Sequence, residues 1–146
     1  MPLPYRIAFN WIEPFVATSG ALQAYFAPHS LQQIETPSIP YHPRLQPLFT
    51  QRTGLWLLLA FNDAVTLRAT RDVRIWRLVL AAGLFSDIFY TLSILEERGA
   101  ARFWNPAAWD VNDWTCLALT IPAMVVKLAC VAGVGLKTSK PSMKDS

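Results

Sequence analysis

The segment that most constrains this fold is a long apolar run, Val73–Leu95, with the sequence VRIWRLVLAAGLFSDIFYTLSIL. A helix needs about 20 apolar residues to cross the roughly 30 Å hydrocarbon core of a bilayer, and this run is long enough. Its single acidic residue, Asp87, lies well inside the run, where a carboxyl is costly unless it faces protein or trapped water. Steps of four, three and four residues place one set on a single helical face: Gly83, Asp87, Tyr90 and Ile94. The run therefore predicts a membrane helix with an inward-facing polar stripe.

Three further apolar runs complete a predicted set of four membrane helices. Their approximate bounds are 7–27, 48–68 and 114–136. The second is the least regular, because its purely apolar part, 54–67, contains Asn62 and Asp63 and by length alone also suits a buried helix of a soluble protein. The composition is 53% hydrophobic and 16% charged, against roughly 25% charged in ordinary soluble domains. We therefore expect an all-α fold, one integral membrane four-helix bundle that occupies the whole chain and ends in a flexible basic tail, 137–146.

The first predicted helix carries a stripe of small and polar residues. The stripe follows steps of three and four residues and consists of Asn10, Glu13, Ala17, Gly20 and Ala24. Small side chains on such a stripe let another helix approach closely. Pro14 has no backbone N–H, so it is expected to kink this helix and to leave the carbonyl of Asn10 without its usual partner.

Two connections between the predicted helices have distinct compositions. Pro28–Pro47 contains five prolines, which are typical of turns and extended structure. Glu96–Asp113 is polar and rich in tryptophan, and we interpret it as a lid or an interfacial segment.

The distribution of Lys and Arg predicts how the bundle is oriented. With four spans, both termini lie on the same side as the second connection, and that side carries eight basic residues against four on the other. Because cytoplasmic segments are enriched in Lys and Arg, both termini are expected in the cytosol, and the endoplasmic reticulum is the expected membrane. The eight are Arg6, Arg68, Arg71, Arg74, Arg77, Lys137, Lys140 and Lys144.

Several classes of function are disfavoured. The net charge of +3 is not gathered on a basic surface, so no nucleic-acid partner is expected. Cys116 and Cys130 are 14 residues apart in one predicted helix, about 21 Å, which is too far for a disulfide. No cluster of Cys and His has metal-ligand spacing, and no glycine-rich nucleotide motif is present, so neither a metal nor a cofactor is expected.

The strongest functional signal is one ionisable residue in each predicted helix. At about 1.5 Å per residue, Glu13, Asp63, Asp87 and Lys127 fall within the same half of the membrane. One interpretation is structural, with Asp87 and Lys127 as a buried ion pair. The other is catalytic: carboxyls in different surroundings hold opposite protonation states, so one donates a proton and another accepts one. Opening an epoxide needs these two roles and no cofactor.

The catalytic interpretation assigns roles to particular side chains. Glu13, Asp63 and Asp87 are the candidate acid and base residues. The candidates for binding or orienting the substrate are Asn10, Asn62, Trp56, Tyr90 and Lys127. The expected substrate is a lipophilic molecule that enters from the bilayer.

Short motifs across most of the chain resemble a group of small four-span fungal membrane proteins, some encoded beside enzymes of secondary metabolism. The motifs are Ile12-Glu13-Pro14, Arg68-Ala69-Thr70-Arg71-Asp72, Trp76-Arg77, Ser86-Asp87, and Asn105-Pro106 with Trp109. The resemblance implies hydrolysis of an epoxide, or cyclisation through one, on a polyketide or terpenoid. It also implies that Glu13, Asp63 and Asp87 carry out that reaction.

A second resemblance keeps alternative functions open. The size and predicted topology are similar to those of four-span sterol-isomerase and sigma-receptor-like proteins, although this chain has no histidine inside a predicted span. The alternatives are therefore a sterol-isomerase-like enzyme or a non-catalytic membrane protein that binds lipid or sterol or assembles pathway enzymes. Membrane lipid, pathway enzymes and a second copy of the chain are the partners considered beside the substrate.

Overall fold

The structure of this protein is a computed structural model that describes residues 1–136; the predicted tail, 137–146, lies outside the described residues. All regular secondary structure in the described part is helical, which confirms the all-α prediction. The elements are α1 (Leu3–Ile7), η1 (Ala8–Ile12), α2 (Glu13–Phe26), α3 (Pro28–Glu35), η2 (Pro43–Leu45), α4 (Gln46–Phe61), η3 (Asn62–Thr66), α5 (Leu67–Ala69), α6 (Val73–Arg98), α7 (Ala100–Phe103), η4 (Pro106–Ala108) and α8 (Val111–Ala132).

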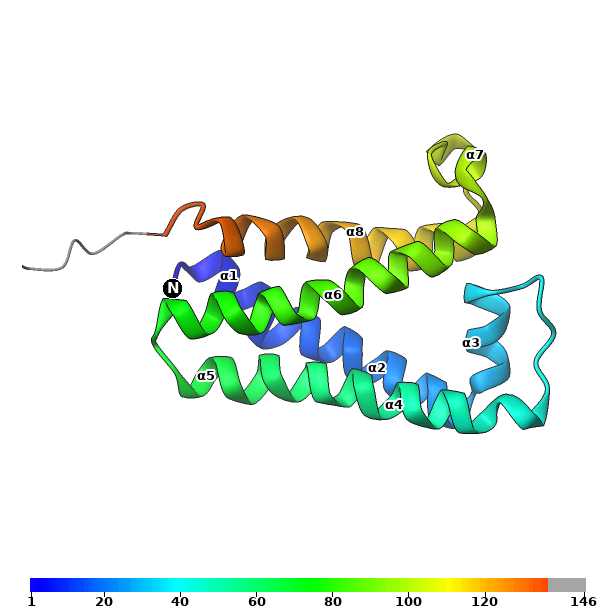
Figure 1. The fold of residues 1–146 in the computed structure, drawn as a ribbon, viewed down its shortest axis with the longest axis horizontal. Helices are drawn as coiled ribbons and strands as arrows, with labels where there is room; N and C mark the ends of the chain where they lie inside the picture. The colour runs from blue at the N-terminus through cyan, green and yellow to red at the C-terminus, as the bar shows by residue number, and fades with distance from the viewer. Residues whose placement is uncertain (137–146) are drawn as a thin grey trace, which may run out of the picture.

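Four long rods built from these helices run side by side (Figure 1). The first rod, 3–26, joins α1, η1 and α2 without a break, and the second, 46–69, joins α4, η3 and α5. In each of these two rods the middle element, η1 or η3, is a single π-helical turn. The third and fourth rods are α6 and α8, and each is long and apolar enough to cross a membrane.

Local capping explains where the third and fourth rods begin and end. The Asp72 carboxylate accepts from the Arg74 N–H at 2.7 Å, so α6 begins at Val73 as predicted, and it continues three residues beyond the predicted end. The fourth rod was predicted at 114–136. It instead begins after Asp110, whose side chain forms a capping box with Asp113, and it ends at Gly133, which has a left-handed backbone.

The segment predicted to be turn and extended structure contains an additional helix. Residues 28–35 form α3, so this part of the prediction is wrong. Pro28 occupies the first turn of α3, where its missing N–H breaks no helical hydrogen bond and its fixed φ favours the helix. Further along the same segment, η2 forms a short 3₁₀ turn. In Figure 1, α3 lies at the end of the molecule opposite Met1.

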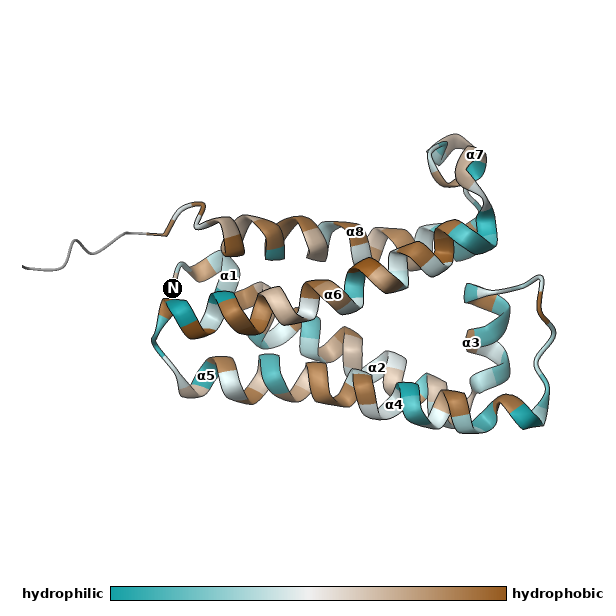
Figure 2. Ribbon diagram, viewed as in Figure 1, coloured by the Kyte–Doolittle hydropathy of each residue, from teal (hydrophilic) through white to brown (hydrophobic). Residues whose placement is uncertain are grey.

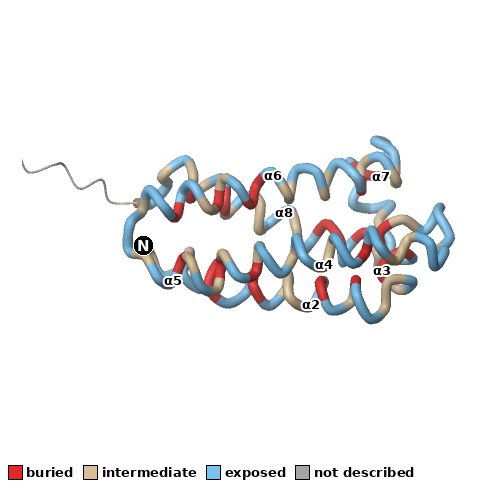
Figure 3. Tube along the Cα trace, turned by 60° about the horizontal axis from the view of Figure 1, so that its bottom comes forward, coloured by how far each residue is buried: buried red, intermediate tan, exposed pale blue. Residues whose placement is uncertain are grey.

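The four rods are arranged as two pairs, in which α2 packs chiefly against α4 and α6 against α8. At one end the pairs share a core, to which Phe9, Leu67, Trp76 and Cys130 contribute. At the other end each pair has a core of its own. One contains Ile94, Phe103, Cys116 and Leu117, and the other contains Ala24, Leu31 and Phe49. Figure 3 shows the buried positions on the inner sides of the rods.

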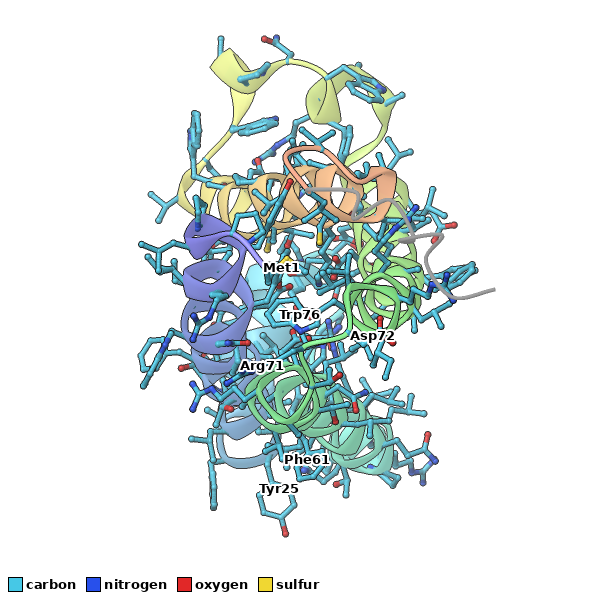
Figure 4. The ribbon with its side chains drawn as sticks, turned by 90° about the vertical axis from the view of Figure 1, so that its left-hand side faces the viewer. Met1, Tyr25, Phe61, Arg71, Asp72 and Trp76 are labelled. Atoms are coloured by element: carbon cyan, nitrogen blue, oxygen red, sulfur yellow. The ribbon has the colours of Figure 1, made fainter. Side chains whose placement is uncertain are left out.

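The start of the first rod meets the segment that follows α8 at the end of the molecule that contains the shared core. The Tyr5 hydroxyl donates a hydrogen bond to the carbonyl of Val134 at 2.8 Å, which ties the first rod to the segment after α8. Viewed onto this end, Met1, Arg71 and Asp72 lie near the viewer (Figure 4). Residues 70–72, which connect the second and third rods, therefore lie at the same end as Met1.

Apolar residues occur along all four rods, among a smaller number of polar ones (Figure 2). In both α6 and α8 only 22% of the most apolar 18-residue stretch is buried inside the protein. Large apolar side chains are also exposed on the first two rods, among them Trp11, Phe15, Phe26, Leu55 and Phe61. Contiguous apolar surface of this kind is rare on monomeric soluble proteins and marks a surface that contacts lipid or another protein.

Candidate functional site

A cavity of about 410 Å³ lies between the two pairs of rods. Its walls come from α2, α3, α4, α6 and α8, and its volume lies within the range of about 300–1,000 Å³ that is typical of small-molecule sites. Most of the lining is apolar, with Val16, Leu59 and Leu119 as examples. A few ionisable side chains also line it, among them Glu13, Glu35 and Asp87.

Lys127 connects two carboxyls at one wall of the cavity. Its ammonium lies 2.8 Å from the carboxylate of Asp87 and also contacts the carboxylate of Glu13, so α2, α6 and α8 meet at one buried charge. Lys127 is only 3% exposed, and its side chain lies over Gly83 of α6. The ion pair predicted between Asp87 and Lys127 is therefore present, and Glu13 is a third member.

Both π-helical turns lie beside this cluster and contact each other. Because Pro14 has no N–H, the carbonyl of Asn10 lacks its usual helical donor, as predicted. It accepts a hydrogen bond instead from the guanidinium of Arg68 at the end of the second rod. The other π-helical turn carries Asp63, which is buried and close enough to Glu13 to interact with it electrostatically. Single π-helical turns within α-helices occur frequently at functional sites.

The structure brings some of the predicted site residues together and separates others. Glu13, Asp87, Tyr90 and Trp56 line the cavity. The other four, which are Asp63, Asn10, Asn62 and Lys127, do not line it.

Those four residues differ in their surroundings. Lys127 lies behind the wall that its two carboxyl partners form. Asn10 is buried, and its side-chain oxygen has no hydrogen-bond partner among the described residues. Asn62 is partly exposed and contacts the Thr66 hydroxyl at 3.5 Å. Of the candidate catalytic residues, only Glu13 and Asp87 are thus placed to contact a molecule in the cavity.

A second polar group at the α3 end of the cavity was not predicted. The carboxylate of Glu35 accepts two hydrogen bonds from the guanidinium of Arg52, one of them at 2.8 Å. That guanidinium lies 4.4 Å from the ring centre of Trp56 and 5.7 Å from that of Tyr90. Glu35 is 5% exposed, and burial raises the pKa of its carboxyl above the usual value, while Arg52 acts in the opposite direction. The sign of this group in the sequence was the spacing of Leu31 and Glu35, which are one helical turn apart.

Charged side chains also fix α3 against the end of the α6 and α8 pair. Arg98, near the end of α6, pairs with Asp113 of α8 and donates to the carbonyl of Ile34 in α3 at 2.7 Å. These contacts join three elements that line the cavity. They hold α3 across the end of the cavity, so that Glu35 lines the cavity.

Comparison with known proteins assigns the chain to a family. No curated protein matches it, and no solved structure does. A family model described as a domain of unknown function, DUF7704, matches residues 1–137, which is nearly the whole chain. The protein is therefore a member of the DUF7704 family.

Proposed function

We propose that all four rods cross a membrane, so that the protein is a multi-pass membrane protein of the endoplasmic reticulum with both termini in the cytosol. The first and second rods, 3–26 and 46–69, are continuous helices, and at about 1.5 Å per residue each is long enough to cross the hydrocarbon core. Large apolar side chains are exposed along both of these rods, as they are along α6 and α8. The arginines at 68, 71, 74 and 77 gather near the end that contains Met1, which supports a cytosolic location for that end.

Within this membrane domain, we infer that the protein opens or cyclises an epoxide on a lipophilic polyketide or terpenoid, without a cofactor. One observation carries the proposal: an apolar cavity of about 410 Å³ has Glu13 and Asp87 in its wall, both bound to one buried lysine. A lipophilic substrate fits the apolar lining, and the two carboxyls supply proton transfer within reach of it.

The charges around Lys127 are suited to that chemistry. Glu13 and Asp87 contact a single ammonium, so full ionisation of both would leave one uncompensated negative charge in an apolar medium. A cluster of this kind retains a proton on one carboxyl while another is ionised. Lys127 contacts both cavity-facing carboxyls and holds them in place.

The proposed reaction uses one carboxyl of each kind. The ionised carboxylate takes a proton from water, or from a hydroxyl of the substrate, as that oxygen attacks an epoxide carbon. The carbon–oxygen bond of the epoxide breaks, and the epoxide oxygen takes the proton of the neutral carboxyl. The product is a diol when water attacks and a cyclic ether when the substrate hydroxyl attacks. One proton transfer between the carboxyls restores the starting state.

A non-catalytic role as a lipid- or sterol-binding protein is the second candidate. The observation that favours it is the completeness of the ion pairing, because Lys127 is 3% exposed and has both carboxyl partners. Such a group holds three helices together whether or not a reaction takes place beside it.

A conversion assay with matched variants separates the two candidates. Wild-type protein expressed in yeast is supplied with a panel of lipophilic polyene and terpenoid epoxides, beside Asp87→Asn, Glu13→Gln and the control Glu96→Gln. Glu96 is an exposed carboxyl on the same helix as Asp87 and lies outside the cavity. A positioned acid or base contributes about 10²–10⁴-fold to rate, so each cavity variant is expected to lose conversion by that factor.

Formation of a diol or cyclic ether by wild type and Glu96→Gln, but not by the two cavity variants at equal protein level, supports the enzyme. Conversion that survives both cavity substitutions refutes the proposed roles of these carboxyls. No conversion by well-expressed wild type across the panel favours the binding protein.

A further inference from the structure

We propose that the α3 end of the cavity is a second binding subsite, which accepts a hydroxyl group at the far end of an elongated substrate. This inference rests on the proposed function, because it names the class of epoxide: a lipophilic molecule with an epoxide at one end and a hydroxyl at the other.

The cavity is long enough to hold two separate polar ends. Along α2 its lining runs from Glu13 to Gln23, which at about 1.5 Å per residue is roughly 15 Å. Along α8 the lining runs from Ala123 to Thr115, roughly 12 Å. The carboxyls bound to Lys127 lie toward the first end, and α3 crosses the second.

Polar side chains from separate elements gather at the second end. Glu35 comes from α3, Tyr90 from α6 and Cys116 from α8, and all three line the cavity. Tyr90 also lies beside the pair of Glu35 and Arg52, with the Arg52 guanidinium 5.7 Å from the centre of its ring. Between this group and the carboxyls bound to Lys127, the wall includes the apolar Leu59 and Leu119, and the hydroxyl of Thr120 there already donates to the carbonyl of Cys116 at 2.8 Å.

The charge balance at this end selects a hydroxyl rather than an ion. Arg52 already neutralises Glu35 through two hydrogen bonds, so neither a free carboxylate nor an ammonium finds an unpaired charge there. Arg52 is also held over the ring of Trp56, which fixes the pair in place. A ligand hydroxyl carries no charge and donates to the Glu35 carboxylate, which has acceptor capacity beyond the two hydrogen bonds from Arg52.

Two epoxides of equal chain length test the subsite. The probes are 11,12-epoxydodecan-1-ol and 1,2-epoxydodecane, assayed with the purified full chain in detergent. Because the hydroxyl adds a hydrogen bond to a charged group at the subsite, kcat/KM is expected to be about tenfold higher for the hydroxylated epoxide. Glu35→Gln is expected to reduce this preference, whereas the exposed control Glu96→Gln keeps it.

The two epoxides distinguish an absent subsite from an absent epoxide-opening activity. Equal kcat/KM for the two epoxides overturns the subsite and leaves the epoxide-opening activity in place. Turnover of neither epoxide counts against the activity, and the subsite is then decided by binding alone, through the cavity thiol of Cys116.

The binding measurement compares dodecan-1-ol with dodecane as protectants of Cys116 against N-ethylmaleimide, with the modified residue located by mass spectrometry. Cys130 is the internal control, because it is a free thiol outside the cavity lining. Protection by dodecan-1-ol at about tenfold lower concentration than by dodecane supports the subsite. Equal protection, no protection, or a Cys116 that does not react with the maleimide overturns it.

Discussion

Substitution of Gly20 by alanine is expected to destabilise the protein, although alanine is the better residue in a helix. A Cβ at Gly20 would lie 2.7 and 2.9 Å from two ring carbons of Trp56, where carbon atoms normally approach to about 3.5–4.0 Å. The indole is not free to move aside, because the Arg52 guanidinium covers it at 4.4 Å and Tyr90 packs against it. Either Trp56 loses these contacts or α2 and α4 separate.

The magnitude follows from two opposing effects. Alanine gains about 1 kcal/mol over glycine inside a helix, whereas overpacking of a close contact costs about 1–3 kcal/mol. The net loss in free energy of unfolding for Gly20→Ala is therefore about 0–2 kcal/mol. Gly54 provides the control, because it lies in α4 and a Cβ there has no neighbour within 4 Å. Gly54→Ala keeps the helical gain without the clash, so the two variants differ by the overpacking cost alone.

Thermal unfolding of both variants in the same detergent, followed by circular dichroism, measures this difference. For a chain of this size 1 kcal/mol shifts the midpoint by about 2–4 °C, so Gly20→Ala is expected to unfold about 2–12 °C below Gly54→Ala. Tryptophan fluorescence of Gly20→Ala is expected to change as Trp56 moves. Equal midpoints for the two variants would refute the close contact between α2 and α4 at this position.

Two further substitutions test the charged groups. Lys127→Met leaves the carboxyls of Glu13 and Asp87 without their shared cation. Since breaking a buried ion pair costs about 3–5 kcal/mol, the detergent-solubilised variant is expected to unfold at a markedly lower temperature than the wild type. An unchanged thermal midpoint would contradict the buried cluster. The carboxyl of Asp110 has a lowered pKa, chiefly because it accepts a hydrogen bond from the Asp113 N–H and also because Arg102 lies beside it. The stability that this cap contributes is therefore complete above about pH 3.9, the ordinary pKa of an aspartate, and is lost as the pH falls through the lowered pKa. Asp110→Ala is expected to lose about 1 kcal/mol at neutral pH and to show a weaker loss of stability in acid, which thermal midpoints across this pH range measure.

Much of the ionic cluster followed from the sequence because helical geometry is regular. A fixed rise per residue placed Asp87 and Lys127 at similar depth, and the structure pairs them at 2.8 Å. The free carbonyl of Asn10 followed equally directly from the missing N–H of Pro14. Its partner, Arg68, did not follow, since a freed acceptor specifies the chemistry of a donor but not which segment supplies it.

The α3 end of the cavity was less predictable, for a physical reason. Proline is compatible both with an extended chain and with the first turn of a helix, so the many prolines between 28 and 47 did not reveal α3. Without α3, Glu35 was one more polar residue of a loop. Its pairing with Arg52 depends on tertiary packing, which brings the end of α3 to the first turns of α4.

The cavity follows from the way the rods are paired, rather than from a missing side chain. At the end that contains Met1, large side chains such as Trp76 and Phe9 fill the space between the pairs. At the opposite end each pair closes on itself, since the Gly20 contact with Trp56 draws α2 and α4 together. The Arg98 contacts hold α3 across the gap that remains. Because each pair is internally satisfied, collapse of the cavity would require one of these packed contacts to break, so the space persists without a ligand.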